Sequence, residues 1–87
     1  MALHYADCIE DNADYYCNRA FSLFYEDALR ALRNLEAAME IEPCHLEALN
    51  MAGELHLFQY EDLSLTPEEA NDIALGFFQR ALAHEPR

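Results

Sequence analysis

Hydrophobic residues recur at intervals of three and four along most of the chain, with polar residues between them. The clearest stripe follows Pro67 and ends near His84; its members are Ala70, Ile73, Ala74, Phe77, Phe78, Ala81 and Leu82. This is the spacing of an amphipathic α-helix with one buried face. Its start is marked as well, because Thr66 can cap the helix and Glu69 completes a capping box.

Two further helical segments precede this one, separated by Pro43, which cannot continue a helix. The first, residues 25–42, presents one apolar face made of Ala28, Leu32, Leu35, Ala38 and Met39. In the second, Leu46, Leu49, Ala52, Leu55 or His56, and Phe58 fall along one side. We therefore expect a first-repeat helix in residues 25–42 and a helix pair in residues 44–85.

The N-terminal segment, residues 1–24, has helical composition but a less decisive pattern. Tyr16, Ala20, Phe21 and Phe24 are spaced for one packed face. No Gly or Pro interrupts the segment, although the polar stretch at residues 10–14 allows a break. The pattern leaves open whether it forms one helix or two. The whole chain, residues 1–87, is predicted to be a single all-α domain of four or five helices.

The composition supports a single all-α domain, and its most unusual feature is an excess of acidic residues. The chain has 53% hydrophobic residues and only two Gly, which is typical of a folded helical domain. Its 17 acidic residues face five basic ones, for a net charge of −12. Such a field repels phosphate and anionic lipid and attracts basic partners, so we expect neither direct nucleic-acid binding nor membrane binding. A purely solubilising surface remains the alternative.

Three cysteines without regular spacing, Cys8, Cys17 and Cys44, argue against a disulfide framework. The first residues contain no basic leader followed by an apolar run, and no stretch reaches the ~20 apolar residues of a membrane span. We therefore expect a cytoplasmic protein.

Two segments repeat the same pattern, "ALRNLEAAMEIEP" at residues 31–43 and "ALGFFQRALAHEP" at residues 74–86. Each contains Ala, a large apolar residue four positions later, a second Ala, and a terminal Pro. A repeated helix pair is typical of solenoid proteins. These residues, together with Gly53 in the preceding helix, resemble the tetratricopeptide repeat (TPR), in which the small residues lie where two helices cross closely. An unrelated four-helix bundle is the alternative.

The resemblance implies antiparallel helix pairs in a right-handed superhelix whose first helices line a groove for a partner. For this chain it implies groove residues Glu47, Asn50, Glu54, Leu57 and Phe58. One subclass of TPR domains clamps the terminal carboxylate of a peptide with Lys and Arg. The chain does not match that subclass, because Asn50 and Glu54 occupy the corresponding positions. The interval of 21 residues from Gly53 to Ala74 is about nine residues longer than a repeat of ~34 residues allows, which predicts a longer inter-helix loop or extended helices before Ala74. Alternatively, Leu57 and Phe58 belong to the core and the glutamates are simply solvated.

Phe77 and Phe78 are adjacent, about 100° apart around a helix, so both cannot face the same neighbour. We expect one of them to lie at the edge of the fold and to contact a second copy or another protein, giving a homodimer or heteromer.

The sequence contains no phosphate-binding loop, nucleophile elbow or paired metal motif. His4 and Cys8, the pair Cys44–His45, and His56 are too scattered for a structural zinc site, so we expect no metal, cofactor or catalytic site. The sequence thus predicts a non-enzymatic interaction module (adaptor, chaperone or inhibitor) that binds a basic or amphipathic segment. The alternative is an acidic mimic of nucleic acid that inhibits a DNA- or RNA-handling enzyme, which would need carboxylates spaced like phosphates on a convex face.

Overall fold

A computed structural model describes the backbone of residues 2–84 and the side chains of residues 13–84. The side chains of His4 and Cys8, and all of Pro86, lie outside the described residues. Within residues 2–84 the chain forms four helices and no strand: α1 (Ala2–Leu23), α2 (Ala28–Ile41), α3 (Leu46–Phe58) and α4 (Pro67–His84). The all-α prediction is confirmed, and the N-terminal segment, which the sequence left open, is a single helix.

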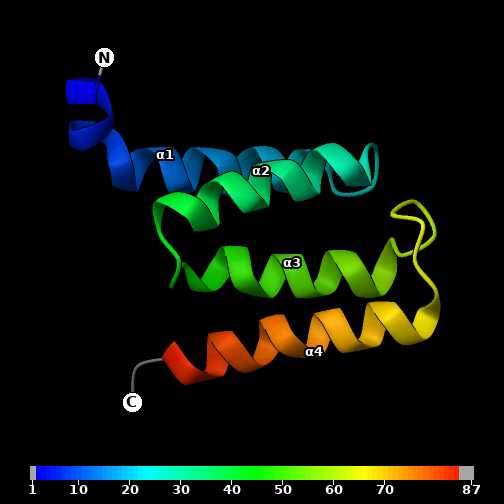
Figure 1. Ribbon diagram of the computed structural model, residues 1–87. Coiled ribbons are helices and arrows are strands. Elements are labelled where there is room, and N and C mark those ends of the chain that lie inside the picture. The colour runs from blue at the N-terminus through cyan, green and yellow to red at the C-terminus, as the bar shows by residue number, and fades with distance from the viewer. Residues whose placement is uncertain (1, 85–87) are drawn as a thin grey trace.

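The four helices lie in chain order across a flat bundle (Figure 1). The principal extents are 42 × 33 × 17 Å. α1 packs mainly along α2, and α3 packs mainly along α4. A smaller contact between α2 and α3 joins the two pairs, and α1 touches α3 over a few residues. Between these contacts some large side chains of α1 and α3 remain exposed, among them Phe21 and Phe58.

The beginning of α4 is fixed by the predicted capping box. The backbone N–H of Glu69 donates to the Thr66 hydroxyl at 3.2 Å, and the Thr66 N–H donates to the Glu69 carboxylate at 3.0 Å. Each side chain thereby satisfies a backbone donor that the first helical turn leaves unpaired. The spacing left open a longer inter-helix loop or extended helices, and the structure has a loop at residues 59–66 between α3 and α4.

Side chains also cap the two middle helices. The Asp27 carboxylate accepts from the Arg30 N–H at 3.2 Å at the start of α2. His45 does the same for α3, where its Nδ1 accepts from the Ala48 N–H at 3.1 Å. Pro43 lies in the short connection between α2 and α3, as expected.

The core consists mostly of alanines, with leucines filling the space between them. Leu35, Leu49 and Leu55 are completely buried. The alanines at matching positions of the two repeated segments are buried as well, namely Ala31, Ala38, Ala74 and Ala81. Small side chains at these positions let neighbouring helices approach closely, which explains why the same spacing recurs in α2 and α4.

Some predicted core positions are wrong. Phe21, Leu82 and Ile73 lie on the predicted apolar faces but are 73%, 61% and 37% exposed. Phe58 is exposed too, so the alternative that placed it in the core is also wrong. The reason is geometric: a thin bundle covers a narrower arc of each helix than the apolar stripe occupies. Among the described residues, no helix combines the length and the apolar character needed to cross a membrane.

Candidate functional site

A groove of about 710 Å³ lies between the C-terminal end of α1 and the exposed side of α3. Residues from both helices and from the turn after α1 line it: Phe21, Ser22, Phe24, Tyr25, Glu47, Asn50, Met51, Glu54 and Phe58. Its lining is mainly apolar. Pockets of this size are typical of small-molecule or peptide binding.

Three aromatic side chains give the groove its apolar character. Phe21, Tyr25 and Phe58 are 73%, 79% and 64% exposed. Tyr25 also packs against the buried Phe24, with ring centroids 4.9 Å apart. Large exposed aromatics gathered on one face are more typical of an interaction surface than of a solvated one.

The polar part of the groove is acidic. Glu47 and Glu54 lie two turns apart on α3, with Asn50 between them, and all three side chains are exposed. None of the residues that line the described groove is cationic. The groove therefore combines an aromatic surface with negative charge that attracts cationic side chains.

The structure brings together four of the five groove residues named from the sequence. Glu47, Asn50, Glu54 and Phe58 line the groove, whereas Leu57 is half-buried and is not part of the lining. The sequence analysis missed the contribution of α1, most of all Phe21 and Tyr25. Their four-residue spacing was a usable signal, because it places both rings on one side of the chain where α1 ends.

The prediction that Phe77 and Phe78 cannot both face the same helix is wrong, because both contact α3 and are half-buried. The Phe77 ring stacks on the buried His56, with centroids 5.5 Å apart, and the Arg80 guanidinium lies 5.6 Å from its centroid. Phe78 lies against Gly53. The more exposed apolar residues of α4 are Ile73, Leu75 and Leu82. An intermolecular contact of α4 stays a prediction.

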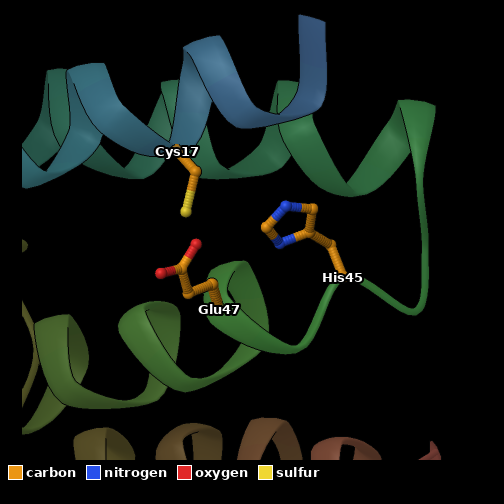
Figure 2. A group of neighbouring side chains, drawn as sticks. All are labelled: Cys17, His45 and Glu47. Carbon is orange, nitrogen blue, oxygen red and sulfur yellow. The ribbon is translucent and has the colours of Figure 1, made fainter. Parts of the chain in front are cut away.

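Beside the groove, three potential metal ligands converge from separate parts of the chain. They are Cys17 of α1, His45 just before α3, and Glu47 in the first turn of α3 (Figure 2). Their ligand atoms all lie within 4.8 Å of one another. The Asp14 carboxylate joins them, with Oδ1 at 2.8 Å from His45 Nε2.

The surroundings of Cys17 oppose its ionisation. Burial, reinforced by the Glu47 and Asp14 carboxylates, raises the pKa of the Cys17 thiol from 9.0 to about 11. Two of these causes are negative charges, so the cluster is a place that favours a cation. The sequence analysis predicted no metal and did not single out Cys17, because nothing in the spacing links residues 17 and 45.

A second cysteine, in the connection between α2 and α3, lies beside a histidine at the end of α4. The Cys44 thiol lies 3.4 Å from His84 Nδ1, and both side chains are exposed. Of the sequence candidates for metal ligands, Cys44 and His45 thus point to different partners. His56 is buried, and its Nδ1 lies 2.7 Å from the Ala52 carbonyl oxygen, to which it donates.

Comparison of the chain with protein-family models, with curated proteins and with solved structures gave no match.

Proposed function

We propose that this chain is a non-enzymatic protein-interaction module whose groove between α1 and α3 binds a basic, amphipathic segment of a partner protein. The observation that carries the proposal is the groove itself, in which Phe21, Tyr25 and Phe58 stand exposed beside Glu47 and Glu54. An amphipathic segment would bury its apolar side chains against the rings and place its cationic side chains near the carboxylates.

The proposal treats the bundle as TPR-like. In it, α1–α2 and α3–α4 are two antiparallel helix pairs of a right-handed superhelix, and α1 and α3 are the first helices that line its concave face. The order in which the helices pack, and the close approach of Gly53 to Phe78, support this assignment. The module would act as an adaptor, chaperone or inhibitor in the cytoplasm.

An apolar groove favours this function over mimicry of nucleic acid. A mimic would present regularly spaced carboxylates on a convex face, and it would have no use for exposed aromatic rings between two helices. In the described part of the chain the exposed rings and the carboxylates share the same hollow.

Self-association is the second part of the proposal. The exposed apolar residues Leu75 and Leu82 on α4 leave a surface that a second copy or another protein would cover. Leu75 and Leu82 do not line the groove, but Leu82 shares a smaller neighbouring hollow with the groove residue Asn50.

A pair of synthetic peptides tests the groove. Both are amphipathic helices with leucines on one face, and the other face carries lysines in one peptide and glutamates in the other. We expect the lysine peptide to bind at least about tenfold more tightly in a fluorescence anisotropy titration, and its affinity to fall as salt rises from about 50 to about 500 mM.

Variants locate the binding. Phe21→Ala and Tyr25→Ala each remove a largely exposed ring of the groove, and each should weaken binding of the lysine peptide about tenfold. Leu75→Ala, an exposed residue outside the groove, is the matched control and should leave the affinity unchanged. Equal binding of both peptides, or equal affinity in all three variants, would contradict the proposal.

A further inference from the structure

We propose that Cys17, His45 and Glu47 bind one zinc ion at the contact between α1 and the start of α3. The site shares Glu47 with the groove but does not rest on the groove's function, because its other two ligands are the buried Cys17 thiol and the histidine that caps α3. The geometry of three side chains carries the proposal. Their donor atoms, which come from α1, from α3 and from His45 just before α3, lie within 4.8 Å of one another (Figure 2).

The donor types select the ion. A thiolate, an imidazole nitrogen and a carboxylate oxygen are the three side-chain ligands that zinc takes in proteins. Magnesium and calcium prefer all-oxygen ligands, so the sulfur and nitrogen donors disfavour them. Three protein ligands leave a fourth position, and Glu47 is exposed, so a water molecule can complete the tetrahedron from the solvent side.

Both ring nitrogens of His45 are hydrogen-bonded, so a zinc ion must displace one of the two bonds. Nδ1 accepts from the Ala48 N–H, so its lone pair is free of a proton and the ring proton is on Nε2, which donates to Asp14. A zinc ion at Nδ1 would replace the Ala48 hydrogen bond and keep the one to Asp14. A histidine that donates its other N–H to a carboxylate is the usual arrangement at zinc sites. Asp14 is therefore a positioning residue and not a ligand.

Charge and protons balance. The Cys17 thiol must lose its proton to solvent as the Zn–S bond forms, while Glu47 binds as the carboxylate and His45 as the neutral ring. In the free protein the Glu47 and Asp14 carboxylates oppose ionisation of Cys17. The same negative charges attract a divalent cation to the site. Zinc binding should thus release one proton from the thiol and fix α1 to α3, two helices that otherwise touch over only a few residues.

Cobalt(II) serves as the probe because it occupies zinc sites and absorbs light when a thiolate is bound. Titration of the reduced full chain with Co²⁺ should give a thiolate-to-cobalt charge-transfer band that saturates at one equivalent and is abolished by added Zn²⁺. The band should disappear in Cys17→Ala and persist in Cys44→Ala and Cys8→Ala. Circular dichroism of each variant shows whether it is folded.

Two substitutions of exposed side chains keep the test valid even if Cys17→Ala fails to fold. Asp14→Asn removes the hydrogen-bond partner of His45 and should weaken Co²⁺ binding roughly 10–100-fold. Glu47→Gln removes a ligand and should weaken Co²⁺ binding by at least as much. The proposal is overturned if no band forms, if the band follows Cys44 or Cys8, or if Glu47→Gln binds Co²⁺ as tightly as the unaltered chain.

Discussion

Phe78 of α4 lies so close over Gly53 of α3 that a Cβ atom at position 53 would be 2.6 Å from Cε1 of the ring. Real Cβ atoms essentially never approach a neighbour that closely, so the absence of a side chain at Gly53 is what lets the two helices cross where they do. The same two residues carry the resemblance to a repeat of paired helices, which gives this contact its importance for the fold.

The first prediction compares the two glycines of the chain. Gly53→Ala forces the Phe78 ring to move, at a cost of about 1–3 kcal/mol for overpacking, against a gain of roughly 0.8–1.0 kcal/mol in helix propensity. We expect a net loss of stability in urea unfolding. Gly76 of α4 has nothing within 4 Å of its Cβ position, so Gly76→Ala should gain the propensity term and raise the midpoint.

If both variants were stabilised to the same extent, the Phe78 ring would not be held against α3, and the close crossing of the two helices would lose its support.

The second prediction concerns the start of α4. Thr66→Ala removes the hydroxyl that accepts from the Glu69 N–H, and a lost cap costs about 1 kcal/mol, within a range of roughly 0.5–2. Thr66→Ser keeps the hydroxyl and is the matched control. Thermal unfolding should show a lower Tm for the alanine variant and a nearly unchanged one for serine. An unchanged Tm in Thr66→Ala would mean that the capping box does not stabilise the fold.

The third prediction rests on the thiols. The thiolate is the reactive form, and burial with the nearby carboxylates raises the pKa of Cys17 to about 11. At pH 8 only on the order of a thousandth of Cys17 is ionised, while Cys44 is exposed. In the presence of a chelator, iodoacetamide should alkylate Cys44 first, and the rate at Cys17 should rise with pH until about 11.

Mass spectrometry of a Cys8→Ala chain separates the two sites by peptide. Equal alkylation rates at Cys17 and Cys44 at pH 8 would show that Cys17 is not held in the buried, acidic surroundings described above.

The structural role of a residue could be predicted from the sequence where that role depends on residues nearby in the chain. Thr66 and Glu69 are three apart, so their reciprocal bonds could be predicted, and the repeated alanines marked where α2 and α4 are buried. The extent of the buried face could not be predicted, because it depends on how much of each helix its neighbours cover. Phe21 and Leu82 therefore look like core residues in the sequence and are exposed in the structure.

The residues of the candidate sites could likewise be predicted only in part. The α3 side of the groove could be named in advance, since the resemblance to the tetratricopeptide repeat implied Glu47, Asn50 and Glu54 there. On the α1 side the spacing of Phe21 and Tyr25 shows that both rings lie on one side of the chain, but only tertiary packing brings them opposite α3. The meeting of Cys17 with His45 likewise depends on the contact between α1 and α3, and no spacing rule for metal ligands covers it.

The fourth prediction addresses self-association. We expect sedimentation equilibrium at micromolar concentration to show a dimer, and Leu82→Asp to shift it toward monomer, because the charge would be buried in the contact. Leu82 is 61% exposed in the single chain, so this variant should stay folded. Phe77→Asp is less informative, since Phe77 stacks on His56 and its loss would destabilise α4. A monomer unaffected by Leu82→Asp would rule out the homodimer and leave a different protein as the only partner for α4.

The central claim is that the groove between α1 and α3 is the binding surface, and the fifth prediction locates binding directly. A two-dimensional ¹H–¹⁵N NMR titration of the labelled chain with the lysine-bearing amphipathic peptide should shift the backbone signals of Phe21, Tyr25, Asn50, Glu54 and Phe58, and should leave those of α4 near Leu75 in place. Shifts confined to α4, or spread evenly over the acidic residues of all four helices, would contradict the account and show that the charge of the chain attracts the peptide without a site.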